Sequence, residues 1–194
     1  MTWLELAAYD AKARFLEMAL LAGYRLDPEK IGVQVLAAPH KQTSLPPGTM
    51  ALYSFWLGQQ ACKVGIASPN DDARFRHHHY SPNSCGSSLA RSVRNAPQRI
   101  GLKAPPTDSR AWLERQLSRI NFILPAAWGQ PVLKLFEAFL HARWRPAYEG
   151  RAWKGFEDAL PAPDLEPCAC PGAQRAAFAG RRGGAPSRCS GAGA

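Results

Sequence analysis

The first part of the chain places apolar residues at the spacing of an amphipathic helix. Over Trp3–Ala22, apolar side chains such as Phe15 and Leu21 fall on one side, and charged ones lie between them. Gly23 follows as a C-cap. A short β-prone run, Ile31–Leu36, comes next, and a loop with three prolines separates it from the rest of the chain.

Two apolar runs separated by a short turn predict a β-hairpin. Met50–Leu57 reads MALYSFWL, and Ala61–Ala67 reads ACKVGIA. The connecting Gly58–Gln60 is short and contains glycine, which is typical of an antiparallel hairpin.

Four helical segments and one further strand follow the hairpin. The helices are predicted at Ala73–Tyr80, Ser87–Asn95, Ser109–Arg119 and Pro131–Trp144. The strand is predicted at Ile120–Leu124. Together these elements predict an α/β (α+β) fold, in which a small three-stranded antiparallel sheet is flanked by helices.

Composition divides the chain into three parts. Residues 1–47 form a helical extension with a linker, residues 48–157 form the predicted α/β domain, and residues 158–194 are rich in Ala, Gly, Pro and Arg. The last part has almost no large apolar residues, so we expect it to be a disordered tail.

The positive charge is concentrated in the middle part. The whole chain carries a formal charge of +9, and residues 48–157 hold fifteen basic but only seven acidic side chains. A basic field on one domain favours polyanions, of which nucleic acid is the commonest. Many basic proteins bind no polyanion, so charge alone favours DNA only slightly.

The sequence predicts a location in the cytoplasm. No stretch has the roughly 20 consecutive apolar residues that a membrane span needs, so we expect no membrane partner. The five cysteines are sparse and odd in number, which favours a reducing compartment over a disulfide framework.

The segment ARFRHHHY carries the first candidate chemistry. Arg74 and His78 are four residues apart, so a regular helix would place both on one face. Arginine binds a phosphate through its planar fork, and histidine transfers protons near neutral pH. A zinc site is disfavoured because His77, His78 and His79 would point about 100° apart from one another on a helix. A solvated basic helix face is the alternative.

Glu137 stands out because its neighbours are apolar. Leu133, Phe136, Leu140 and Trp144 form a stripe along the last helix, and Glu137 is embedded in it. A carboxylate at the edge of a buried face is costly unless a cation or a metal ion accepts it. The alternative is a Glu137 side chain that reaches solvent or pairs with a local arginine.

Polar residues after the histidines are candidates for binding a nucleic-acid strand. Ser87, Ser88 and Arg91 lie near a predicted helix N-terminus, where backbone N–H groups favour phosphate, and Arg94 extends this track. Tyr80 could stack on a base, although core packing is the commoner role of such an aromatic side chain. Ordinary helix capping by Ser87 or Ser88, with solvated arginines, explains the pattern equally well.

In order and spacing, these pieces resemble the GIY-YIG endonuclease superfamily. That family opens with a hairpin whose two strands carry Gly-Ile-Tyr and Tyr-Ile-Gly. It continues with an arginine-bearing helix and ends with a glutamate-bearing helix. Here the two triplets read Ala51–Tyr53 and Lys63–Gly65, and the residues matching the helix positions are Arg74, His78 and Glu137.

The resemblance implies hydrolysis of a DNA phosphodiester by a one-metal mechanism. Tyr53, activated by Lys63 or His78, would take the proton from an attacking water, and a cation such as Lys63 would help Tyr53 to ionise. Arg74 would neutralise charge on the scissile phosphate. Glu137 would hold Mg²⁺ or Mn²⁺. The DNA could be single- or double-stranded, and the sequence leaves the oligomeric state open.

Two departures from the family pattern keep other functions open. Lys63 replaces the tyrosine of the second triplet, and the asparagine that commonly follows the glutamate helix is missing. One alternative is therefore a catalytically decayed nucleic-acid-binding module of the same fold. A weaker alternative is a basic interaction protein that uses the N-terminal helix as a partner surface. The joint presence of Tyr53, Arg74, His78 and Glu137 favours the nuclease.

Overall fold

A four-stranded antiparallel sheet forms the centre of the computed structural model, which describes residues 1–83 and 88–148. β2 (Thr49–Leu57) pairs with β3 (Gln60–Ala67) across the predicted hairpin turn and with β4 (Ser118–Pro125) on its other side. β1 (Gly32–Leu36) pairs with the outer side of β4, so the order is β1-β4-β2-β3. The mixed class is confirmed, but the predicted count of three strands is wrong.

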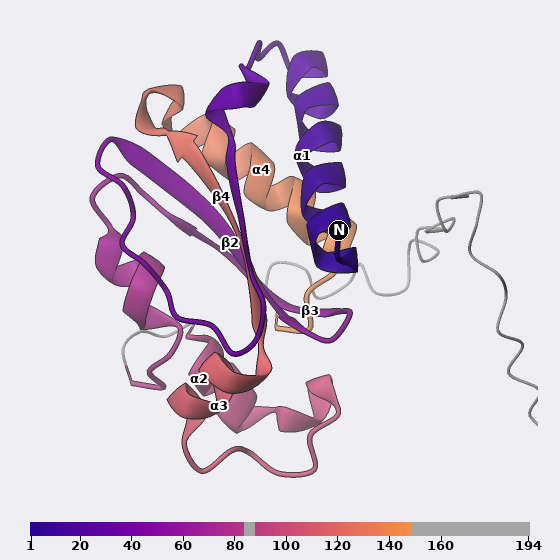
Figure 1. Cartoon of the computed structure of the whole chain (residues 1–194), viewed down its shortest axis with the longest axis vertical. Helices are drawn as coiled ribbons and strands as arrows, with labels where there is room; N and C mark the ends of the chain where they lie inside the picture. The colour runs from indigo at the N-terminus through magenta and orange to yellow at the C-terminus, as the bar shows by residue number, and fades with distance from the viewer. Residues whose placement is uncertain (84–87, 149–194) are drawn as a thin grey trace, which may run out of the picture. The chain divides into compact units, whose positions relative to one another are not determined.

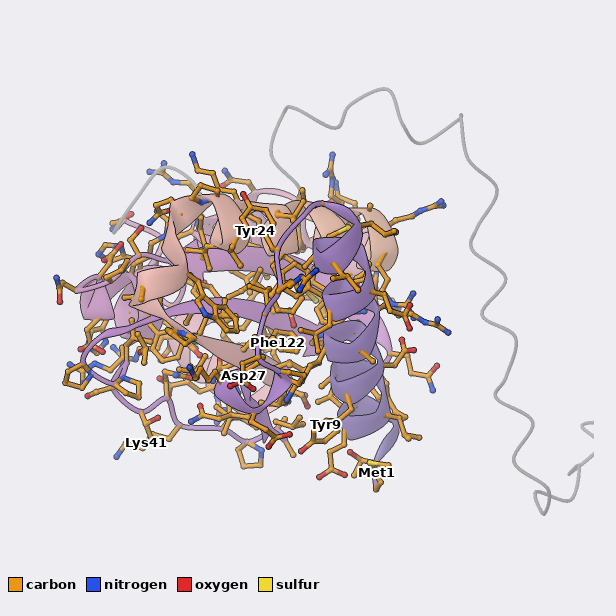
Figure 2. All side chains as sticks on the ribbon, turned by 90° about the horizontal axis from the view of Figure 1, so that it is seen from above. Met1, Tyr9, Tyr24, Asp27, Lys41 and Phe122 are labelled. Carbon is orange, nitrogen blue, oxygen red and sulfur yellow. The ribbon has the colours of Figure 1, made fainter. Side chains whose placement is uncertain are left out.

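Two helices cover one face of this sheet. α1 (Trp3–Leu21) begins with a capping box, in which Thr2 and Glu5 exchange hydrogen bonds between side chain and backbone. α4 (Gly129–Trp144) lies beside it (Figure 1). Alternate residues of the strands, Phe122 among them, pack against both helices (Figure 2). Because these contacts are nearly all apolar, this face is a hydrophobic core.

The opposite face carries shorter helical segments. They are a π-helix at Arg74–His78, α2 (Leu89–Asn95) and α3 (Ser109–Gln116), and α2 and α3 lie together away from α1 and α4 (Figure 1). Asp108 caps α3 by accepting a hydrogen bond from the Ala111 N–H. The predicted helix over Ser109–Arg119 is too long. α3 ends at Gln116, and Arg119 belongs to β4.

The first 47 residues contribute to the same sheet and core as the middle part. β1 supplies an edge strand, and α1 buries Leu4, Phe15 and three alanines against α4 and the strands. The predicted tail, residues 158–194, lies outside the described residues.

Candidate active site

Tyr53 and Gly65 sit opposite each other on β2 and β3. A Cβ at position 65 would lie 2.8 Å from Cε2 and 3.1 Å from the hydroxyl oxygen of Tyr53. Only glycine therefore lets the tyrosine ring lie over β3 in this way. Since β3 is an edge strand, the hydroxyl end of Tyr53 is directed towards the open edge of the sheet.

The Tyr53 hydroxyl is held by two hydrogen-bonding partners. It lies 2.8 Å from Nε2 of His79 and 3.4 Å from the carbonyl oxygen of Ile66. Nδ1 of His79 is buried and has no partner within the described residues. An orphaned buried N–H is rarer than an orphaned acceptor, so we assign the proton to Nε2. His79 then donates to Tyr53, and Tyr53 donates to Ile66.

Burial keeps this pair neutral. It raises the pKa of Tyr53 to about 12, although the charges of Arg119 and Arg74 act to lower it. Burial, aided by the charges of Lys63, Arg119 and Arg74, holds the pKa of His79 well below its ordinary value. Cations therefore do favour the ionised form of Tyr53, but they are Arg119 and Arg74 in place of the expected Lys63, and burial outweighs them.

The π-helix explains why His79 occupies the place expected for His78. In a regular α-helix, residues four apart share a face, but in a π-helix the repeat lengthens towards five. Arg74 and His79 are five apart, and both act on the Tyr53 hydroxyl. His78 is half-buried and belongs to the same short helix. The sequence pattern has no signal for this extra residue per turn.

Arg74 and Lys63 add positive charge at the same edge. The Asp71 carboxylate accepts a hydrogen bond from the Arg74 N–H and so fixes the start of the π-helix. Lys63 stands opposite Phe55, on the Tyr53 face of the sheet. It is half-buried, and its ammonium lies 3.5 Å from the Tyr148 carbonyl oxygen.

Glu137 reaches this cluster from α4. Its neighbours Leu133, Phe136 and Leu140 are buried as predicted, while Glu137 is half-buried. Burial raises the pKa of the Glu137 carboxyl, and the charges of His141, Arg74, Lys134 and Lys63 oppose that rise. The carboxylate is therefore close enough to the cations of the π-helix and β3 to feel their charge.

A single carboxylate limits the metal ions that could bind here. Within residues 1–83 and 88–148 there is no group of three or more His, Cys, Asp or Glu side chains able to hold a metal ion. This excludes a zinc-type cage from the described residues. The donor chemistry does fit Mg²⁺ or Mn²⁺ bound by Glu137 alone, because Mg²⁺ keeps most of its waters and takes further oxygens from a phosphate.

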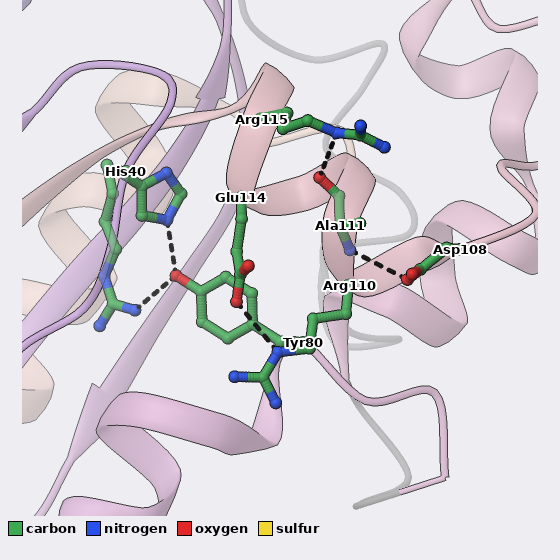
Figure 3. Close-up of polar contacts among 8 residues, drawn as sticks. His40, Tyr80, Asp108, Arg110, Ala111, Glu114 and Arg115 are labelled. Carbon is green, nitrogen blue, oxygen red and sulfur yellow. Dashed lines mark hydrogen bonds and ion pairs between the residues drawn. The ribbon is translucent and has the colours of Figure 1, made fainter.

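The predicted strand-binding residues do not form one surface. Ser88 is buried and caps α2 by accepting a hydrogen bond from the Arg91 N–H. Tyr80 is also buried, and its hydroxyl is engaged inside the protein (Figure 3). Arg91 is half-buried, and Arg94 is exposed. Ser87 lies outside the described residues.

Arg94 lines an open cavity between α2 and α3. The cavity has a volume of ≈ 430 Å³, and Arg110 and Ser109 also line it. Arg110 is paired with Glu114 at 3.0 Å (Figure 3). The N-terminus of α3 is not open to an anion there, because the Asp108 carboxylate, which caps that helix, also lines the cavity.

Arg119 is a functional candidate that the sequence pattern did not identify. It lies on β4 with no exposed surface, and its guanidinium carbon is 4.5 Å from the centre of the Tyr53 ring. Arg119 and Asn121 alternate with apolar residues at 120, 122 and 124. That alternation is the signal that could have identified a strand with one polar face.

No protein-family model matches this chain, and no curated protein or solved structure is found to match it. Among the described residues, no helix combines the length and the apolar character needed to cross a membrane.

Proposed function

We propose that this protein is a metal-dependent endonuclease that hydrolyses DNA phosphodiester bonds. The observation that carries the proposal is the convergence of five side chains at the β3 edge. Tyr53 and His79 are hydrogen-bonded to each other. The charge of Arg74 acts on this pair and on Glu137, and the charge of Lys63 acts on His79 and Glu137. A base, phosphate-binding cations and a carboxylate are the parts that hydrolysis of a phosphodiester requires.

Each side chain has a role that follows from its chemistry. Tyr53, as the phenolate, takes a proton from the attacking water, and the His79 N–H stabilises that phenolate. Arg74 and Lys63 neutralise the phosphate as charge builds on it. Glu137 would hold Mg²⁺ or Mn²⁺, which supplies Lewis-acid stabilisation of the leaving oxygen. Because Tyr53 has no exposed surface, the reaction requires DNA binding to admit a water to its hydroxyl.

The charge distribution supports DNA as the partner. Residues 48–157 hold an excess of basic side chains, and the described ones include exposed Arg94, Arg99 and Arg115. Exposed cations of this kind bind a polyanion with strong salt dependence. The same field fits single- and double-stranded DNA, so strand preference is left to the experiment.

The test is cleavage of matched single- and double-stranded DNA with Mg²⁺ or Mn²⁺, comparing wild type with Glu137→Ala. We expect metal-dependent cutting that Glu137→Ala abolishes. Glu17→Gln is the matched control, because Glu17 is exposed on α1 and should leave the rate unchanged. Cutting that persists in Glu137→Ala would remove the carboxylate from the mechanism.

The burial of Tyr53 favours a second candidate function, a nucleic-acid-binding module of the same fold without turnover. A fully buried tyrosine with a pKa of about 12 is a poor base unless the site opens. DNA binding without cutting, under either metal and in both strand forms, would establish this second function and overturn the first.

A further inference from the structure

Arg119 is a buried cation packed between aromatic rings. Its guanidinium carbon lies 4.5 Å from the Tyr53 ring centre, 4.7 Å from that of Phe75 and 5.0 Å from that of Phe55. At these distances the positive charge faces the electron-rich side of each ring. Arg119 therefore packs against one face of the Tyr53 ring and fixes the position of that ring.

The hydrogen-bond partners of Arg119 are all neutral. It donates to Oδ1 of Asn121 at 2.7 Å, to the Phe75 carbonyl oxygen at 2.9 Å and to the Tyr80 hydroxyl at 3.2 Å. No carboxylate in the described part of the chain comes within salt-bridge distance of it. Packing alone does not explain such a residue, because a buried charge is often replaced by apolar side chains without loss of stability.

Further neutral groups hold this arrangement rigid. The Tyr80 hydroxyl lies 2.7 Å from Nε2 of His40 (Figure 3). Nδ1 of His40 lies 2.7 Å from the Leu117 carbonyl oxygen. Asn121 donates to Oε1 of Gln34. The network connects β1, β4 and the segment after the π-helix, so the guanidinium cannot turn away from the Tyr53 ring.

We propose that Arg119 is a positioning residue for the hydrolysis: it holds the Tyr53 ring and stabilises the negative charge on the Tyr53 oxygen when that oxygen acts as the base. The inference rests on the proposed function.

In the hydrolytic step, the phenolate oxygen of Tyr53 takes a proton from water and the water oxygen forms a bond to phosphorus. One P–O bond breaks, and the leaving oxygen takes a proton from solvent. Tyr53 then returns its proton to solvent.

Three other charged or titratable groups of the described residues act on Tyr53. Arg74 and Asp71 approach it from the π-helix and the residues before that helix, and His79 contacts its hydroxyl. Arg119 differs from these groups because it is fully buried and lies against the ring face. Its removal should therefore change the ionisation of Tyr53 without changing the surface that meets DNA.

The first test measures single-turnover DNA cleavage from pH 7 to 10.5 for wild type, Arg119→Lys and Arg119→Met. The wild-type rate should rise about tenfold per pH unit, because the phenolate fraction does so below its pKa. Arg119→Met should be at least about tenfold slower at each pH with unchanged DNA affinity, and Arg119→Lys should recover part of that loss. Adding Arg119→Met to Tyr53→Phe should slow the Tyr53→Phe protein no further. Additive losses would indicate a merely structural role and overturn the proposal.

The second test does not depend on cleavage. The ¹³Cζ resonance of Tyr53, assigned with Tyr53→Phe, reports its ionisation, and the titration should begin at higher pH in Arg119→Met. If Arg119→Met does not fold, Asn121→Asp serves instead, because a carboxylate beside the guanidinium cancels its charge and should shift the titration in the same direction. If wild type cuts DNA but the Tyr53 titration is the same in the variant as in wild type, the role of Arg119 alone is overturned. A wild type that cuts no DNA overturns the proposed function and this role with it.

Discussion

The two faces of the central sheet bury different kinds of side chain. The face under α1 and α4 buries aliphatic and aromatic residues, together with the hydroxyl of Ser54, which accepts a hydrogen bond from Trp56. The other face buries Arg119, Asn121 and, beside Tyr53, the ring of His79. Apolar burial stabilises a fold directly, whereas each buried polar group must first recover its lost hydration. On this second, polar face, burial is therefore costly unless each polar group finds a partner.

Phe136→Ala should have the largest effect on stability, because it opens a cavity in the apolar face. The Phe136 ring stacks on Phe15 at 3.8 Å and lies 4.8 Å from Phe122. Removing a buried phenyl ring costs about 3–5 kcal/mol, and urea denaturation would measure it. Phe139→Ala, at a partly buried position on the same helix, should cost less. Equal losses at the two positions would contradict the assignment of the core to this face.

Gly65→Ala should disturb the polar face more than the addition of one methyl group suggests. The added methyl group would meet the Tyr53 ring at 2.8 Å, so the ring must move and its hydrogen bond to His79 is lost. Such overpacking typically costs about 1–3 kcal/mol, and DNA cleavage should fall with it. Gly32→Ala, on the other edge strand β1, is the matched control, because its methyl group would lie 3.4 Å from Ile123. A Gly65→Ala protein that melts and cuts like wild type would rule out the close approach.

Lowering the pH should reduce the stability of the protein through the histidines buried on the polar face. Burial lowers the pKa values of His79 and His40 in the folded protein, so below pH ~6.5 the unfolded chain binds more protons and folding becomes less favourable. Each histidine adds a slope of at most about 1.4 kcal/mol per pH unit in that range. The raised pKa of Glu137 acts in the opposite sense above pH ~4.5.

Thermal melts of wild type and His79→Gln between pH 7.5 and 5 would measure this effect. The wild-type melting temperature should fall as the pH drops, and His79→Gln should flatten the decline. His77→Gln, which changes an exposed histidine of the same π-helix, should leave the pH dependence unchanged. Identical profiles for all three proteins would show that His79 is not kept neutral by the fold.

Local patterns predicted the parts of the site that depend on neighbours in sequence. The hairpin carrying Tyr53 and Lys63 follows from two apolar runs around a turn, and the half-buried Glu137 follows from its place in an apolar stripe. Arg119 was placed at the end of the helix predicted over Ser109–Arg119, one residue before the predicted strand. Its pairing with Leu36 and Phe55 joins segments more than sixty residues apart. Local spacing carries no information on such pairing, and for the same reason the β-prone run Ile31–Leu36 was left out of the predicted sheet, although it is β1.

Ser88→Ala should have the smallest effect, and it separates two explanations of the serine at the start of α2. The buried Ser88 hydroxyl accepts a hydrogen bond from the Arg91 N–H, so its loss should cost about 1 kcal/mol of stability. DNA affinity should be unchanged, because the hydroxyl faces the helix and not solvent. Arg94→Ala should show the reverse pattern, with weaker and less salt-dependent DNA binding and an unchanged melting temperature. If Ser88→Ala instead weakens DNA binding without lowering stability, then Ser88 contacts the DNA. The functional surface would then extend along α2, beyond the buried network around Arg119.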